Sequence, residues 1–416
     1  MENEKTRAII AGINFTSVWE YSIEELKGLA EADEVEVLGV CTQSLEKPNS
    51  ATYIGKGKTE ELKELVSNME ANLVIFNNEL SGVQIRNLED RLEVKVIDRT
   101  ILILDIFAKR AKTKNGQLQV ELAQQKYRKS RLVGFGNYLS KQGAGIGTRG
   151  PGEKKIETDR RHLEKRIEDI QNEIDKAVQV RKTQRKLREK NRVPIVALVG
   201  YTNAGKSALM NALLKDIEKE DKVVFEKDML FATLDTSQRS IKYDDNNEFI
   251  LVDTIGFVSE LPHTLVDAFK GTLEEVLYAD LLIHVIDISN SRSEFQERVT
   301  LKVLNEIGAG DKEILNVYNK ADLLQEEVPK TVLDDKLYIS AKYGINIDLL
   351  KEKIGDQLFN NKIDVKLLIP YDRGDIVSYL CDKCNVEEMD YKEDGTIITT
   401  SLEIDDYRRL SKYEIV

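Results

Sequence analysis

The sequence predicts a multidomain α/β protein, and three patterns along the chain carry this prediction. Over roughly the first hundred residues, short apolar strands alternate with amphipathic helices, which is typical of a parallel α/β domain. A heptad-like helical pattern follows, and beyond it a strand leads into a glycine-rich loop and another helix. We expect an N-terminal α/β domain, an antiparallel helical hairpin with a glycine-rich loop, a P-loop domain and a small C-terminal α/β domain, at residues 1–99, 100–192, 193–360 and 361–416.

The composition is that of a globular protein. The chain has 416 residues, of which 41% are hydrophobic and 32% are charged. No apolar run approaches the length of about eighteen residues that a membrane-spanning helix needs. The start, Met1-Glu2-Asn3, lacks the apolar segment of a signal peptide. We therefore expect a cytoplasmic protein with no membrane span. We also expect it to be a monomer.

Cysteines and histidines are too few and too scattered to predict a metal site of their own. Cys381 and Cys384 form a single C-x-x-C without a second pair, and the three histidines show no ligand spacing. A structural zinc site needs four ligands. We expect these cysteines to be core or surface thiols.

The net charge of −12 is distributed unevenly. Between Arg99 and Arg192 there are 25 Lys or Arg and 11 Asp or Glu, so a basic block lies within an acidic chain. Such a block is the electrostatic pattern of a protein that contacts a phosphate backbone. This segment is therefore expected to bind nucleic acid.

Within the N-terminal domain, one loop also carries lysines. The strands expected at residues 8–11, 35–40, 73–76 and 94–97 are separated by helical patterns, and Gly55-Lys56-Gly57-Lys58 precedes one of these. A Gly-Lys loop before a helix can hold a phosphate, which makes Lys56 and Lys58 candidates for a second nucleotide site. On sequence alone, an ordinary turn is the more common reading.

The basic block predicts a helical hairpin. The pattern is helical from Thr100 to about Arg131, whereas residues 134–152 contain too many glycines for the interior of a helix or strand. After this loop, a heptad seam is formed by Ile156, Leu163, Ile167, Ile170, Ile174 and Ala177. Two helical segments on either side of a loop predict an antiparallel pair with a glycine-rich tip.

Cations gather around this tip together with aromatic rings that can stack on bases. The alternative is a solvated coiled coil with an idle loop, but a loop of this length is more often functional. The candidates for RNA contact are Lys141, Arg149, Lys154, Lys155, Arg160 and Arg161.

A phosphate site is predicted where strand 195–199 ends in a glycine-rich loop that opens a helix. Backbone N–H groups and the positive end of the helix dipole converge at such a point. Lys206 is placed to reach the β- and γ-phosphates, and Ser207 offers its hydroxyl to Mg²⁺. The expected phosphate-facing residues are Gly200, Asn203, Ala204, Gly205, Lys206, Ser207 and Ala208.

Two further segments are expected to contact Mg²⁺ and the γ-phosphate of the bound nucleotide. Asp253 ends the strand at 249–253 and should orient Mg²⁺ through water, while the N–H of Gly256 can approach the γ-phosphate. In the loop at 230–237 we place Phe231 at the nucleotide and Thr233 in the Mg²⁺ shell with Ser207, with Thr236 as the alternative to Thr233. Loss of the γ-phosphate would then release both loops together.

Guanine selection is predicted by Asn319-Lys320-Ala321-Asp322, which follows the strand at 314–318. The carboxylate of Asp322 can accept both N–H groups on one edge of guanine, and adenine offers a different donor pattern. Ser340-Ala341-Lys342 is placed to meet the base with a backbone N–H. Four such elements in order across about 140 residues predict a GTPase domain with GTP as substrate and Mg²⁺ as cofactor.

The chain resembles the HflX family of ribosome-associated GTPases, in the Obg–HflX branch of translation-factor-class P-loop GTPases. The resemblance rests on Phe231-Ala232-Thr233-Leu234-Asp235, on Asp253-Thr254-Ile255-Gly256-Phe257, and on the motif 145–153 with Glu157-Thr158-Asp159-Arg160-Arg161. It implies binding to the large ribosomal subunit and the 70S ribosome, with the hairpin on ribosomal RNA, and splitting or rescue of stalled ribosomes. It also implies ATP binding by the N-terminal domain, which strengthens Lys56 and Lys58.

No catalytic side chain is assigned. Phe257 occupies the position where many GTPases carry a glutamine that orients the attacking water. We expect slow intrinsic hydrolysis that the ribosome stimulates. His263 follows in the same loop, and a structural role is favoured over proton transfer because loop position alone does not bring it to the water.

Two other functions stay open on sequence grounds. One is an RNA-remodelling ATPase driven by the Lys56 and Lys58 loop, and the other is a binding protein in which GTP occupancy controls RNA affinity. Residues 361–416 are acidic and carry no motif. They predict a small α/β appendage packed on the GTPase domain.

Overall fold

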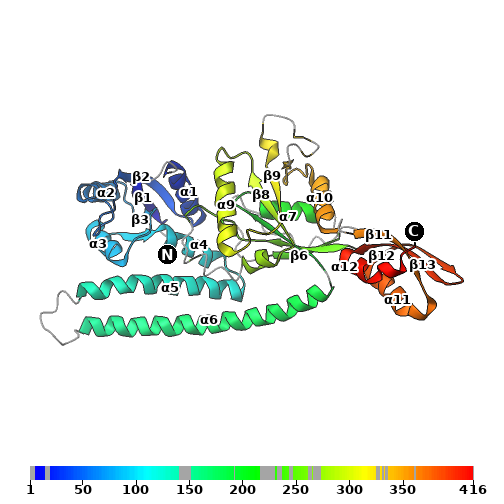
Figure 1. Cartoon of the computed structure of the whole chain (residues 1–416). Coiled ribbons are helices and arrows are strands. Elements are labelled where there is room, and N and C mark those ends of the chain that lie inside the picture. Colours follow the sequence, from blue (N-terminus) through cyan, green and yellow to red (C-terminus); the bar gives the residue numbers. More distant parts are fainter. Residues whose placement is uncertain are drawn as a thin grey trace.

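The computed structural model describes most of the chain, and three sheets with a long helical hairpin make up its described part (Figure 1). The described residues are 5–14, 19–139, 151–191, 193–215, 230–231, 237–242, 247–260, 265, 273–324, 328–329, 332, 336–359 and 362–415. Figure 1 shows the N-terminal and P-loop domains side by side above the hairpin, with the C-terminal domain at the far end. The expected multidomain α/β architecture is confirmed.

The N-terminal domain is a four-stranded parallel sheet in the order β2-β1-β3-β4. Its strands are β1 (Arg7–Asn14), β2 (Glu36–Ser44), β3 (Leu73–Phe76) and β4 (Lys95–Asp98). Its helices are α1 (Trp19–Ala32), α2 (Lys56–Asn68), α3 (Gly82–Leu92) and α4 (Arg99–Arg110). Helix α3 lies where a helical pattern was expected between the third and fourth strands, and Ser81 and Gln84 form a capping box at its start.

Alternate residues of these strands face two separate cores, because successive side chains of a strand point to opposite faces. On one face Ile10 and Ile75 pack with α1 and α4, and on the other Ile9 and Val74 pack with α2 and α3. The first of these cores does not stop at the domain. It continues into the P-loop domain through Tyr201, Phe231, Ile255, Val258 and Leu265.

The helix expected from Thr100 onward is interrupted. Helix α4 ends at Arg110 and belongs to the N-terminal core, and α5 (Lys114–Leu139) begins after a short break. Helix α5 runs through Gly134 and Gly136, so the expectation that these glycines lie in the loop was wrong. A glycine costs about 1 kcal/mol relative to alanine in a helix, and a 26-residue helix can absorb this cost.

Helix α6 (Pro151–Asn191) runs back along α5 and closes the hairpin (Figure 1). The expected apolar seam is confirmed in its middle part, where Ile167, Ile170 and Ile174 pack with residues of α5. Ion pairs across the hairpin join Lys129 to Glu164 at 3.0 Å and Arg166 to Glu121 at 2.7 Å. The glycine-rich tip at 140–150 lies outside the described residues.

The P-loop domain is a six-stranded sheet in the order β10-β9-β8-β5-β7-β6, in which only the β6–β7 pairing is antiparallel among the described strands. The strands are β5 (Ile195–Gly200), β6 (Ser237–Lys242), β7 (Glu248–Asp253), β8 (Leu281–Asp287), β9 (Ile314–Asn319) and β10 (Leu337–Tyr338). The helices packed with this sheet are α7 (Lys206–Leu214), α9 (Ser293–Ile307) and α10 (Ile347–Phe359). The parallel strands end at a single edge, where the expected nucleotide motifs lie.

The C-terminal domain is a three-stranded antiparallel sheet in the order β11-β13-β12. Its elements are β11 (Lys362–Ile369), α11 (Gly374–Lys383), β12 (Asn385–Lys392), β13 (Gly395–Glu403) and α12 (Ile404–Leu410). Its apolar cluster contains only residues from this part of the chain. Cys381 is exposed and Cys384 partly buried, and both are free thiols. None of the helices that the structure describes, in any domain, is long and apolar enough to span a membrane.

Candidate functional site

The loop between β5 and α7 has a backbone that only glycine can adopt at two points. Gly200 has φ +149° and Gly205 has φ +93°. A Cβ on Gly200 would lie 2.3 Å from the carbonyl oxygen of Val285, and one on Gly205 would lie 2.2 Å from Nδ2 of Asn319. The two glycines therefore let the loop approach β8 and β9 closely, with α7 beginning at Lys206.

Lys206 is buried at the start of α7. Its Nζ donates to the carbonyl oxygens of Gly200 (3.1 Å) and Tyr201 (2.8 Å). Burial lowers the pKa of Lys206 to about 8, and the nearby charge of Asp253 opposes this shift. A phosphate bound in this loop would supply the negative charge that a buried ammonium lacks.

Ser207 and Asp253 meet beside this lysine. The Ser207 hydroxyl donates to Oδ2 of Asp253 at 2.6 Å, and Asp253 is fully buried at the end of β7. A hydroxyl and a carboxylate are the hard oxygen donors that Mg²⁺ prefers, so this pair fits the expected metal. Thr233, the other expected ligand, and its alternative Thr236 lie outside the described residues.

Asn319 ties two of the expected motifs together. Its Nδ2 donates to the carbonyl oxygen of Ala204 (2.9 Å), and its Oδ1 accepts from the N–H of Ala341 (3.0 Å). Asn319 is 2% exposed. One amide side chain therefore joins the phosphate loop to the Ser340-Ala341-Lys342 loop. The two contacted residues, Ala204 and Ala341, are 137 positions apart in the sequence.

The remaining expected base contacts lie around Asn319. Lys320 has φ +61° and forms an ion pair with Asp287 at 2.8 Å, and Asp322 lies in the short helix η2 (Ala321–Leu323). The hydroxyl of Ser340 accepts from the N–H of Tyr343 at 3.3 Å, and the Lys342 ammonium lies near the Tyr343 ring. The structure thus brings the phosphate, metal and base motifs to one edge of the sheet.

The segment after Gly256 is bonded to the phosphate loop. The N–H of Thr202 donates to the carbonyl oxygen of Phe257 (2.7 Å), and the N–H of Phe257 donates to the carbonyl oxygen of Gly200 (3.1 Å). A Cβ on Gly256 would lie 2.6 Å from Cα of Thr202. The Phe257 side chain is 2% exposed and packs in the apolar core. His263 lies outside the described residues.

Comparison with known proteins identifies the family. Residues 20–108, 110–188 and 195–320 match the families described as GTP-binding GTPase N-terminal, GTP-binding GTPase Middle Region and 50S ribosome-binding GTPase. The GTPase HflX of Caldanaerobacter subterraneus subsp. tengcongensis is 49% identical over 416 residues, which cover 100% of this chain and 95% of that protein. The chain belongs to the HflX family. It is therefore a GTPase that hydrolyses GTP and associates with ribosomes.

Other HflX proteins are also similar. The GTPase HflX of Alkalihalophilus pseudofirmus is 45% identical over 360 residues, covering 86% of this chain and 84% of that protein. Among solved structures, a GTP-binding protein from the archaeon Sulfolobus solfataricus in complex with GDP is 25% identical. That match covers 85% of this chain and 99% of the archaeal chain, with a TM-score of 0.45.

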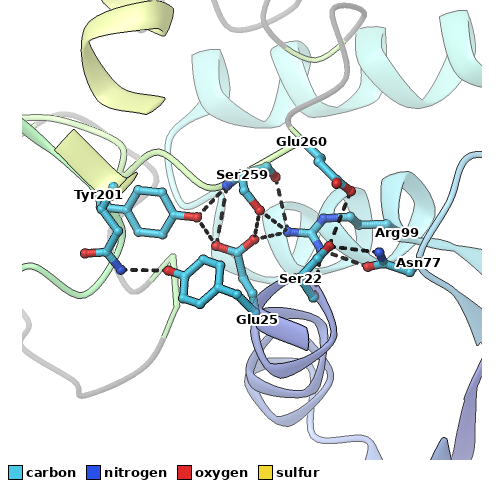
Figure 2. A network of polar contacts seen from close by, with 9 residues as sticks. Ser22, Glu25, Asn77, Arg99, Tyr201, Ser259 and Glu260 are labelled. Carbon is cyan, nitrogen blue, oxygen red and sulfur yellow. Dashed lines mark hydrogen bonds and ion pairs between the residues drawn. The ribbon is translucent and has the colours of Figure 1, made fainter. Parts of the chain in front are cut away.

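In this HflX-family GTPase, a buried polar network joins the N-terminal domain to the nucleotide site (Figure 2). Glu25 of α1 and Arg99 of α4 form an ion pair, and each side chain is 3% exposed. Glu25 accepts hydrogen bonds from the hydroxyls of Tyr201 and Ser259. Sequence reasoning missed this network, although Tyr201 lies within the phosphate loop and Arg99 immediately precedes the apolar first turns of α4.

Phe231, two positions before Thr233, also contacts the N-terminal domain. The N–H of Phe231 donates to Oγ1 of Thr202 at 2.7 Å, which holds this residue beside the phosphate loop. Its ring packs edge-on against Phe107 of α4, with 4.7 Å between ring centroids. Segments on both sides of the HflX phosphate loop therefore contact α1 or α4.

A cavity of ≈ 440 Å³ lies between α1 and the phosphate loop. The walls from the P-loop domain include Thr202, Asn203 and Leu230. The walls from α1 include Glu24 and Glu31, so this side is acidic. The cavity leaves Asn203 accessible next to the expected phosphate position.

The expected RNA and ATP residues are described only in part. Arg160 and Arg161 of α6 are 45% and 73% exposed and lie 3.6 and 3.3 Å from Glu157. Lys141 and Arg149 lie outside the described residues, and of Lys154 and Lys155 only the helical backbone is described. Lys56 is exposed at the start of α2, and Lys58 pairs with Glu61 at 2.7 Å. An ATP site there stays a prediction.

Proposed function

We propose that this GTPase couples its nucleotide state to the splitting or rescue of stalled ribosomes, with the α5–α6 hairpin on the RNA of the large subunit. The observation that carries the proposal is a continuous set of contacts from hairpin to nucleotide loop. Asp98 accepts hydrogen bonds from Tyr127 and Arg131 of α5, the latter at 2.8 Å. The next residue, Arg99, donates to the carbonyl oxygen of Ser259 at 3.1 Å.

The phosphates of GTP bind the loop at residues 200–208, with Lys206 on the β- and γ-phosphates. Ser207 and Thr233 would hold Mg²⁺, and Asp253 would orient it through water. When bound, the metal would supply positive charge to balance the β- and γ-phosphate oxygens. The burial of Lys206 and the 2.6 Å contact between Ser207 and Asp253 support this assignment.

Guanine is recognised by the Asp322 carboxylate, while Asn319 holds the phosphate loop and the Ser340-Ala341-Lys342 loop together around the base. The test is Asp322→Asn. An asparagine side chain donates where the carboxylate accepts, so it matches xanthine, which has a carbonyl in place of the guanine amino group. Titration should show a loss of GDP affinity and a gain in XDP affinity. Retention of the GDP preference would contradict the assignment.

Hydrolysis by the isolated protein is slow because the residue after Gly256 offers no hydrogen bond to water. Phe257 is buried in the core, so its side chain cannot be directed at the γ-phosphate in this arrangement. The ribosome raises the rate by ordering the loops at Thr233 and Gly256. Fast single-turnover hydrolysis without ribosomes, unchanged when ribosomes are added, would contradict this step.

The splitting role is tested by sedimentation of 70S particles with the protein and GTP, a non-hydrolysable GTP analogue, or GDP. Free subunits should accumulate with GTP and with the analogue but not with GDP. A variant with Arg160→Gln and Arg161→Gln should bind ribosomes more weakly and split fewer. Equal splitting with GTP and GDP would show that nucleotide state does not control the reaction.

A further inference from the structure

We propose that Glu25 and Arg99 are positioning residues for the GTPase reaction. They hold the segment after Gly256 against the phosphate loop and so oppose the arrangement that GTP requires. The inference rests on the proposed role of Gly256 as the γ-phosphate contact. Figure 2 shows the two side chains between α1, α4 and the loop that carries Ser259.

The two terminal nitrogens of Arg99 bind different partners. Its Nη1 donates to Oδ1 of Asn77 (3.0 Å) and to the carbonyl oxygen of Ser22 (3.3 Å), which fixes the guanidinium within the N-terminal domain. Its Nη2 donates to Glu25 and to the carbonyl oxygen of Ser259 (3.1 Å). The planar fork of an arginine can make such contacts at once, and a lysine cannot.

Ser259 is held by both its backbone and its side chain. Its N–H donates to the Tyr201 hydroxyl at 2.6 Å, its hydroxyl donates to Glu25, and its carbonyl accepts from Arg99. The Tyr201 hydroxyl in turn donates to Glu25. One buried carboxylate therefore contacts the residue after Gly200 and the residue three positions after Gly256.

These contacts restrain Gly256 because the chain between it and Ser259 is also bonded to the phosphate loop. The N–H of Phe257 donates to Gly200 and its carbonyl oxygen accepts from Thr202, so the short segment from Gly256 to Ser259 is fixed at both Phe257 and Ser259. If Gly256 moves to meet a γ-phosphate, Ser259 must shift from Glu25 and Arg99. Separating a buried ion pair from its hydrogen-bond partners is unfavourable, because Glu25 and Arg99 are each 3% exposed and depend on these protein groups for their hydrogen bonds.

The test compares affinities for fluorescent GDP and a fluorescent non-hydrolysable GTP analogue, measured on the full chain. Ser259→Ala removes the hydrogen bond that the hydroxyl donates to Glu25 and the longer one, 3.4 Å, that it accepts from Arg99, and it leaves the ion pair intact. The ratio of the GDP to the analogue dissociation constant should rise about threefold to tenfold, which is the range expected for the loss of one short buried hydrogen bond, the long contact adding little. A double variant, Glu25→Leu with Arg99→Met, removes both charges together and should raise the ratio further.

Two more variants separate positioning from a merely structural role. Arg99→Lys keeps a charge beside Glu25 but not all the hydrogen bonds, so its ratio should lie between those of the wild type and the double variant. Arg7→Gln breaks the Arg7–Glu70 pair at the surface of the same domain and should leave the ratio unchanged. A structural role alone would lower the melting temperature of the variants without changing the ratio.

An unchanged ratio in both Ser259→Ala and the double variant, or a shift of either toward GDP, would overturn the inference. Its failure is distinct from failure of the proposed function. If the ratio rises but 70S particles are not split, the inference stands and the ribosomal role fails. If Asp322→Asn switches the base preference as expected while the ratio stays fixed, only the inference fails.

Discussion

Asn319→Ala should weaken guanine-nucleotide binding strongly, because one side chain links the phosphate loop to the base loop. The substitution removes the hydrogen bond from Nδ2 to the Ala204 carbonyl and the one from the Ala341 N–H to Oδ1. Both partners are buried, with Ala204 1% and Ala341 4% exposed. Neither group gains full access to water when the side chain is shortened.

The magnitude follows from the two groups left unsatisfied. A buried donor or acceptor without a partner costs about 1–3 kcal/mol, so the two together cost at least about 2 kcal/mol in the binding arrangement of the loops. Each 1.4 kcal/mol corresponds to a factor of about ten in affinity. GDP affinity should therefore fall by about 30-fold or more.

The assay is titration with fluorescent GDP, alongside thermal unfolding. Asn87→Ala is the matched control, because Asn87 also donates to a backbone carbonyl, that of Ala51 at 2.9 Å, but at the exposed surface of the N-terminal domain. The control should bind GDP like the wild type. If folded Asn319→Ala binds GDP within threefold of the wild type, the two hydrogen bonds do not shape the site and the reasoning is wrong.

Three further predictions concern charge and backbone geometry. Lys206→Met should abolish GDP binding yet raise the melting temperature of the ligand-free protein at pH 7, because burial holds the pKa of this lysine at about 8 instead of 10.5. Between these pH values the unfolded chain binds more protons than the folded chain, so the ligand-free wild type should become more stable as pH rises. Over the same range GDP affinity should fall, because Lys206 in the free site loses its proton. A flat pH profile of denaturant unfolding would contradict the first expectation, and a flat pH profile of GDP titration would contradict the second. Gly205→Ala should lose GDP binding, since its Cβ would meet Asn319 and φ is +93°, and wild-type affinity by calorimetry would refute this. Replacing Arg160 and Arg161 by Gln should make ribosome binding less dependent on salt. The slope of log binding constant against log salt concentration should fall by about one unit for each phosphate that is no longer neutralised. Arg166→Gln, which loosens a cross-hairpin pair with Glu121, should leave this slope unchanged.

The sequence predicted those parts of the molecule that local pattern controls. The strands at β1, β3, β5 and β9 follow from short apolar runs, and the loop at Gly200 and Gly205 follows from a motif whose backbone needs glycine. The helix break between Arg110 and Lys114 was missed, although the sequence carries a signal for it. Residues 112–117 have no apolar side chain, and Thr113 accepts from the N–H of Gly116 at 3.0 Å and so caps the start of α5.

The buried network could not be predicted, because no local pattern relates its members. Glu25 and Ser259 are 234 positions apart, and Glu25 and Tyr201 are 176 apart. A charged residue in an amphipathic helix normally faces water, so the pattern of α1 gave no reason to bury Glu25. Only the packing of α1 against the P-loop domain removes this carboxylate from solvent and provides its partners.

The adjacency of Asp98 and Arg99 at the end of β4 has a mechanical consequence. Asp98 accepts from Arg131 in the second half of α5 and caps α4, and Arg99 donates to the carbonyl oxygen of Ser259 in the loop beyond Gly256. Consecutive Cα atoms are about 3.8 Å apart across a rigid peptide unit. A movement of the hairpin that displaces Asp98 therefore also displaces Arg99, so it is transmitted to the loop beyond Gly256 across a single peptide unit.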